Sequence, residues 1–132
     1  MTLRKRNRII AYKITPWRDP VLTVSTGPIV LEMDETANVL DEMREYIECD
    51  YIEHLRIDVN GIPFDLWFDE QGKLTHKWPS YPLLDSTGMP YDFIVGTMIV
   101  TKDDGGNIVS LSDKEIELFE DDYCKNRFKL LQ

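Results

Sequence analysis

The fold is decided by residues 54–67, which read HLRIDVNGIPFDLW. The dipeptide Asn60-Gly61 suits the two positive-φ positions of a two-residue turn, and an alternating run of apolar residues lies on each side of it. Such a turn fixes the register, so that Val59 faces Ile62 and the apolar residues beyond them also pair. The stretch therefore predicts a β-hairpin with one apolar face.

The second face of this hairpin carries polar and aromatic residues. The same register places Arg56 opposite Asp65 and His54 opposite Trp67, which predicts a salt bridge and an aromatic packing pair. Neither His54 nor His76 has a serine or cysteine at the spacing of a nucleophilic triad. We therefore predict no catalytic residue and expect that the protein is not an enzyme.

Two helices are indicated on either side of the hairpin. Apolar residues recur at helical spacing over residues 36–47, and either Asp34 or Thr36 can cap the start of that helix. The pattern from Ser112 to Glu115 matches a capping box, and apolar residues follow it on one face. These signals predict one helix before the hairpin and one near the C-terminus.

Strands are expected at residues 8–14, 28–33, 93–101 and 107–109. Residues 21–24 and 28–33 could form one bent hairpin around Gly27, residues 93–101 read as one continuous buried strand, and the proline-bearing residues 73–91 read as an irregular connection. We predict an α+β fold, a small mixed or antiparallel sheet with a central hairpin packed by two helices. It should form a single domain over residues 1–132, with residues 1–7 a flexible basic N-terminus.

The charge is acidic and unevenly distributed. The formal net charge is -9, and residues 32–70 hold 13 acidic residues but two basic ones. A chain of this charge does not suit direct binding of nucleic acid, whose partners present basic surfaces. No apolar run is long enough to span a membrane or to form a signal peptide, so we expect a cytoplasmic protein in the cell that makes it.

Motifs for metals and cofactors are also absent from the sequence. The run Asp103-Asp104-Gly105-Gly106 lacks the alternating ligands and distal glutamate of a calcium loop, and no helix start follows it at the spacing of a phosphate-binding loop. Cys49 and Cys124 lie far apart and are expected to be reduced thiols. We predict no metal and no cofactor.

Several motifs between Tyr46 and Phe119 resemble the phage and plasmid family catalogued as domain of unknown function 3846. They are YIE at 46–48, DEQGKL at 69–74, DFIVGT at 92–97 and SLSD at 110–113, and they have the character of fold determinants. The sequence WPSYP at 78–82 replaces the linker that is usual in that family. The resemblance implies a small α+β domain from a mobile element, and it supplies no catalytic residue.

These observations favour a binding protein. The leading hypothesis is a mobile-element accessory protein that inhibits a host nucleic-acid-targeting defence system, such as a CRISPR nuclease, by occupying the partner's basic cleft with a DNA-mimicking acidic surface. The candidate contacts are the acidic residues Asp41, Glu42, Glu45 and Glu48 and the aromatic residues Trp67, Trp78, Tyr81 and Tyr91.

Two alternatives remain open at this point. The first is a small-ligand protein that binds a nucleotide or second messenger between the hairpin and residues 73–91, and the second is an uncharacterised enzyme. The chain could be a monomer, or a homodimer formed through an edge strand at residues 8–14.

Overall fold

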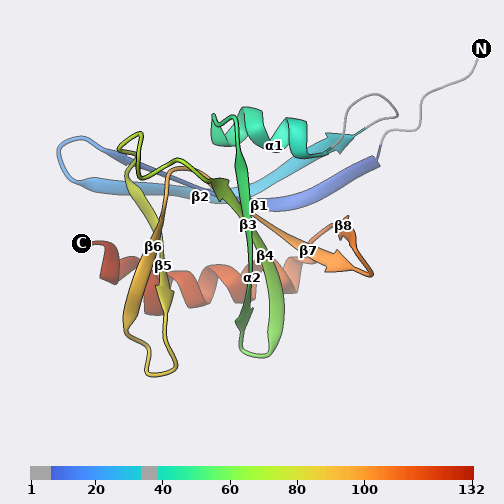
Figure 1. Ribbon diagram of the computed structural model, residues 1–132. Coiled ribbons are helices and arrows are strands. Elements are labelled where there is room, and N and C mark those ends of the chain that lie inside the picture. Colours follow the sequence, from blue (N-terminus) through green and yellow to red (C-terminus); the bar gives the residue numbers. More distant parts are fainter. Residues whose placement is uncertain (1–6, 34–38) are drawn as a thin grey trace, which may run out of the picture.

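The computed structural model describes residues 7–33 and 39–132. These residues form a six-stranded antiparallel sheet in the order β2-β1-β7-β4-β3, with β8 beside β7, and a separate two-stranded sheet of β5 and β6 (Figure 1). The strands are β1 (Asn7–Arg18), β2 (Leu22–Met33), β3 (Ile52–Val59), β4 (Ile62–Asp69), β5 (Pro79–Leu84), β6 (Pro90–Val95), β7 (Met98–Asp104) and β8 (Asn107–Val109). The helices are α1 (Val39–Ile47) and α2 (Asp113–Asp122), and α2 continues into a π-helical turn (Tyr123–Arg127) and a 3-10 turn (Phe128–Leu131). The predicted α+β class with an antiparallel sheet and two helices is confirmed.

The hairpin of β3 and β4 has the predicted register. Val59 lies opposite Ile62, and the apolar and polar pairs follow in step along both strands. Asn60 and Gly61 both adopt positive φ, at 50° and 84°. Turn chemistry and alternation therefore determine this element locally.

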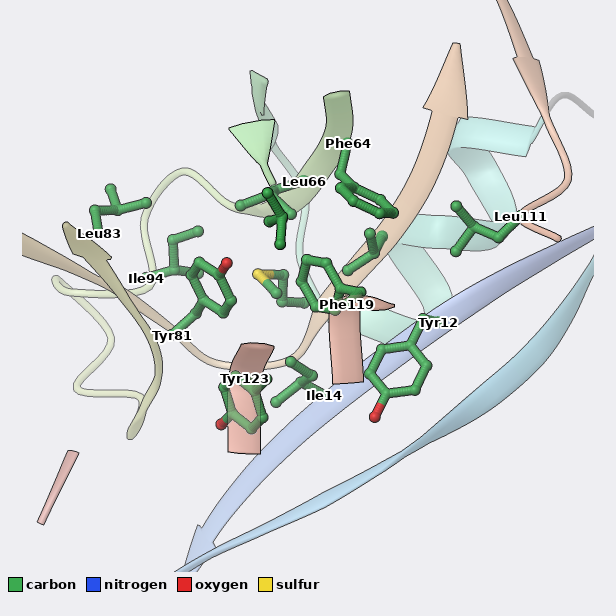
Figure 2. Close-up of a cluster of buried hydrophobic side chains, with 13 residues drawn as sticks. Tyr12, Ile14, Phe64, Leu66, Tyr81, Leu83, Ile94, Leu111, Phe119 and Tyr123 are labelled. Carbon is green, nitrogen blue, oxygen red and sulfur yellow. The ribbon is translucent and has the colours of Figure 1, made fainter. Parts of the chain in front are cut away.

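The two helices cover opposite faces of the large sheet (Figure 1). On the α2 face, the ring of Phe119 lies between Tyr12, Phe64 and Tyr81, with ring centroids 5.8, 5.2 and 5.7 Å away (Figure 2). On the other face, Met43 and Ile47 of α1 pack with apolar residues of β1, β2 and β7. Each helix therefore buries its apolar stripe against one face of the sheet.

The prediction of one continuous strand over residues 93–101 is wrong, because the strand is interrupted at Gly96. Gly96 has a φ of 81° and separates β6 from β7, which belong to different sheets. The following strand β7 is central and buried, as the apolar run indicated. Periodicity could not find the break, because the residues on both sides of Gly96, from Phe93 to Thr101, are apolar or β-branched.

The expected irregular connection over residues 73–91 is also wrong in part. Residues 79–84 form β5, which pairs with β6 and contains both Pro79 and Pro82. Within the described residues β5 pairs with no second strand, so these prolines leave few ladder hydrogen bonds unmade. The register also shifts twice along the pair, as is usual at bulges.

The first two strands are longer than predicted. β1 runs through Pro16, which is tolerated because β7 pairs with β1 only at residues 12–14. Residues 22–33 form one strand through Gly27 and not a bent hairpin. Because β1 lies between β2 and β7, the expectation that residues 8–14 form an edge strand is wrong, and the suggested homodimer loses the edge on which it depended.

The helix ends were predicted with unequal success. Ser112 and Glu115 form the predicted capping box. The described part of α1 begins at Val39, so the expected caps Asp34 and Thr36 lie outside the described residues. The expected flexible N-terminus also lies outside them, except that Asn7 belongs to β1.

Candidate partner-binding cleft

A cleft of about 340 Å³ separates the β3–β4 hairpin from the β5–β6 hairpin. The same two hairpins lie beside each other in Figure 1. The cleft is lined by Glu53 and Leu55 of β3, residues 68–70 at the end of β4, Lys73, Leu83 of β5 and residues 91–95 of β6. This is the place between the hairpin and residues 73–91 that the sequence suggested for a ligand.

The floor of the cleft is apolar. Leu55 and Phe68 come from the α2 face of the β3–β4 hairpin, and Leu83 and Ile94 come from the other hairpin. Leu83 is 9% exposed and Ile94 is 2% exposed, so the floor continues into the buried core (Figure 2). Such a floor can bury the apolar part of a ligand or peptide side chain.

The rim of the cleft is acidic. It carries four carboxylates and one ammonium group, that of Lys73. Lys73 pairs with Asp92, and Asp69 pairs with Lys77 at 2.8 Å. Within the described residues no ion pair involves the exposed side chains of Glu53 and Glu70. These two carboxylates give the cleft an uncompensated negative charge that favours a basic ligand.

The position of the cleft is fixed by a tight junction between β4 and β6. A Cβ atom on Gly72 would lie 2.7 Å from Cγ2 of Val95, so the turn after β4 approaches β6 as closely as only glycine allows. Lys77, which follows this turn, ties it to the end of α1. Its Nζ donates hydrogen bonds to the carbonyl oxygens of Ile47 and Glu48 at 3.1 and 3.0 Å. Its ammonium group therefore lies at the negative end of α1.

The four acidic residues predicted on α1 do not form one free surface. Glu42 accepts a hydrogen bond from the backbone N–H of Glu32 at 2.7 Å, and Asp41 pairs with Arg44 at 2.8 Å. Glu45 is exposed, and Glu48 is exposed just past the helix with a φ of 59°. Two of the four carboxylates are therefore engaged within the domain.

The four predicted aromatic contacts lie in different environments. Tyr91 is 66% exposed at the rim of the cleft. Trp78 is 44% exposed and lies under the guanidinium group of Arg18, outside the cleft. Trp67 is half-buried on the α1 face, and Tyr81 is fully buried in the core. Of these four residues, Tyr91 is the one that a ligand in the cleft would contact. The side chain of Tyr81 is not accessible to a partner.

A polar cluster on the α1 face surrounds Asp65, whose side chain is 4% exposed. Its Oδ1 accepts hydrogen bonds from Nε2 of His54 at 2.9 Å and from Nε of Arg56 at 2.8 Å. Burial opposes ionisation of Asp65, but these hydrogen bonds outweigh it and hold its pKa below the ordinary value of 3.8. His54 also packs on Trp67 with ring centroids 4.4 Å apart, as the register predicted. The cluster stabilises the hairpin and holds the side chains of His54 and Arg56 in place.

The remaining candidate features are the cysteine thiols, the possible metal ligands and the helices of the described residues. Both cysteines are free thiols, and burial, followed by the carboxylate of Asp69, raises the pKa of Cys49. In residues 7–33 and 39–132 no group of three or more His, Cys, Asp and Glu side chains is arranged to hold a metal ion. The helices of this described part are all too short or too polar to cross a membrane.

A comparison with protein families shows to which family the chain belongs. The family model described as Domain of unknown function (DUF3846) matches residues 17–124. The match extends beyond the motifs between Tyr46 and Phe119 and covers both hairpins that form the cleft. Searches of curated proteins and of solved structures found no match. The chain therefore belongs to the family of domain of unknown function 3846.

Proposed function

We propose that this domain binds a basic segment of another protein in the cleft between its two hairpins. The observation that carries the proposal is the combination of an apolar floor with the unpaired carboxylates of Glu53 and Glu70 on the rim. An apolar floor rewards burial of a side chain, and an acidic rim attracts a partner of opposite charge and speeds its association. Tyr91 adds an exposed aromatic residue of the kind that dominates binding energy at interfaces.

The cleft is a better candidate than the acidic face of α1. On α1, the carboxylates of Asp41 and Glu42 are held by partners within the domain, and the hollow that the described residues form beside them is lined by Glu42, Glu45 and Tyr46, without aliphatic residues like those of the cleft floor. A surface of isolated exposed carboxylates often serves solubility alone. The helix face therefore supplies a matched control for the cleft and not the leading site.

The partner that we propose is a nucleic-acid-binding protein, because such proteins present basic segments to the phosphate backbone. A chain of net charge -9 is suited to compete for those segments. As the biological setting we propose inhibition of a host defence nuclease, such as a CRISPR nuclease, in the bacterial cytoplasm. This setting rests on the charge of the chain and on the mobile-element origin that its resemblance implied.

The test uses a fluorescent peptide of sequence Arg-Thr-Leu-Thr-Leu-Thr-Arg and measures its anisotropy with the full chain. We expect binding that weakens as salt is raised, and a loss of about tenfold or more when Glu53 and Glu70 are both changed to lysine. The matched control changes Glu45 and Glu48 of the α1 region to lysine, which alters net charge equally. Equal loss in both double variants would contradict the cleft and indicate an unspecific charge effect.

A second candidate function is the binding of a small ligand in the same cleft. Its volume of about 340 Å³ lies at the lower end of the range for such sites. The acidic rim repels phosphate groups, so a cationic or neutral ligand suits it better than a nucleotide. A thermal-shift screen that includes nucleotides and polyamines tests this candidate, and stabilisation by a nucleotide would contradict the charge argument.

A further inference from the structure

The free edge of β3 borders the cleft. β3 is the last strand of the large sheet, and within the described residues it pairs with β4 alone. The pairing alternates: in a two-residue hairpin the residues next to the turn exchange hydrogen bonds, and so does every second pair after them. Val59 and Ile62 are that first pair, and the backbone N–H of Glu70 bonds the carbonyl of Tyr51 at 3.0 Å, in keeping with this alternation.

It follows that the odd-numbered residues of β3 direct their backbone groups toward β4. The even-numbered residues direct theirs away from the sheet. They are Ile52, His54, Arg56 and Asp58. Together they present a row of backbone donors and acceptors along an eight-residue strand that has no proline and no bulge.

The opposite edge of the sheet is different. The edge strand β2 contains Pro28, which has no backbone donor, and Gly27 beside it. Natural edge strands are commonly interrupted by proline to prevent pairing with another chain. β3 lacks that interruption and lies next to an apolar hollow, so it is the edge suited to receive a strand.

Resting on the function proposed above, we propose that the partner's segment binds as an additional β-strand on the free edge of β3. Residues directly opposite each other on paired strands project to the same face of a sheet. Side chains of the added strand opposite Glu53 and Leu55 would therefore project into the cleft, where the former attracts a basic residue and the latter an apolar one. The occupant is thus an extended segment in which basic and apolar residues alternate with neutral ones.

Charge distinguishes this occupant from a second copy of the chain. Pairing of two β3 edges would bring two acidic rims together, each with the carboxylates of Glu53 and Glu70, which like-charge repulsion opposes. A basic segment meets the same rim with attraction. Backbone hydrogen bonds supply affinity in this mode of recognition, and alternate side chains supply specificity.

The test uses the same peptide with the full chain and two matched N-methylated forms. One form carries N-methyl groups on its two leucines and the other on two of its threonines. In an extended peptide these two sets of N–H groups point to opposite edges. Strand addition predicts that one form loses about tenfold or more in affinity while the other binds nearly as well as the parent.

The two possible losses also report the direction of the added strand. Residues that face the cleft direct their backbone groups toward β3 in a parallel pairing and away from it in an antiparallel pairing. Loss with the methylated leucines thus indicates a parallel strand, and loss with the methylated threonines an antiparallel one. Equal affinity of both forms would overturn strand addition and leave the cleft proposal intact, whereas failure of the parent peptide to bind would overturn both.

A pair of protein variants provides an independent measurement. His54→Pro and His54→Ala both remove the imidazole that contacts Asp65 and Trp67, but only proline also removes the outward N–H. We expect peptide affinity to fall at least about tenfold further in the proline variant than in the alanine variant. Circular dichroism of both variants shows whether the fold is kept. Equal affinity of two folded variants would overturn the proposal.

Discussion

The substitution Gly96→Ala tests how Lys77 holds the junction of β4, β6 and α1 beside the cleft together. Gly96 has a φ of 81°, and a Cβ atom added to it would lie 2.7 Å from Cδ of Lys77. Gly96→Ala therefore forces an L-residue into the left-handed region, at about 1–2 kcal/mol. It also displaces a side chain whose ammonium group binds Asp69 and the carbonyl oxygens of Ile47 and Glu48 at the end of α1.

The two effects can be separated in magnitude. A hydrogen bond to a charged group contributes about 1.5–3 kcal/mol, and partial exposure of Lys77 places the loss of its contacts nearer to 1–2 kcal/mol. We expect Gly96→Ala to lower the free energy of unfolding by about 2–4 kcal/mol in total. That is a large fraction of the stability of a domain of this size, which is roughly 7–20 kcal/mol.

Urea unfolding followed by tryptophan fluorescence measures this loss in two backgrounds, the wild type and Lys77→Ala. Gly88→Ala is the matched control, because Gly88 has a φ of 84° and nothing lies within 4 Å of its added Cβ. In a Lys77→Ala background, Gly96→Ala should cost no more than the control does. An equal cost of Gly96→Ala with and without the lysine side chain would show that the added methyl group does not displace Lys77.

Two further predictions concern buried polar groups. Tyr81→Phe should leave the free energy of unfolding unchanged or raise it by up to about 1 kcal/mol, because the Tyr81 hydroxyl is buried without a hydrogen-bond partner among the described residues. Tyr123→Phe should lower the free energy of unfolding by about 1 kcal/mol, because it removes the 2.7 Å hydrogen bond that the Tyr123 hydroxyl donates to the carbonyl of Ser80. Urea unfolding of both variants checks this pair, and a larger loss in the Tyr81 variant would contradict it. Because the pKa of Asp65 is lowered in the folded state, its ionisation stabilises the domain above pH 3.8, and that contribution is lost as the pH falls through the lower folded pKa. The stability difference between the wild type and Asp65→Asn should therefore shrink between pH 7 and pH 3, and a constant difference would show that ionisation of Asp65 contributes nothing.

The part of the fold that could be predicted from the sequence is the part with local signals. Asn60-Gly61 determines a register, and the capping box at Ser112 determines a helix start, and both are confirmed. The break at Gly96 could not be predicted, because a glycine in an apolar strand pattern gives no sign of its φ before its neighbours are known. The strand β5 was not predicted because its two prolines argue against a central strand. A strand that pairs on one side only, as β5 does within the described residues, tolerates proline.

The candidate site was predicted only in outline. Only the alternative of a small-ligand protein placed a pocket between the hairpin and residues 73–91, and the structure has a cleft there. The acidic residues chosen from α1 came from helical spacing alone, which cannot show that Glu42 accepts a backbone hydrogen bond. The register of the β3–β4 hairpin brings Glu53 and Glu70 near each other, but the cleft beside them exists only because the β5–β6 hairpin packs against theirs, which the sequence does not show. Side-chain pairing across distant segments is not encoded in any local pattern.

The most direct test of the proposed binding site is a nuclear magnetic resonance titration of the ¹⁵N-labelled full chain with the basic peptide. A binding site in the cleft predicts that the amide signals of β3 and of β6, including those of Leu55 and Tyr91, shift progressively, while those of α1 stay in place. Shifts confined to α1, or spread evenly over the acidic surface, would contradict a binding site in the cleft.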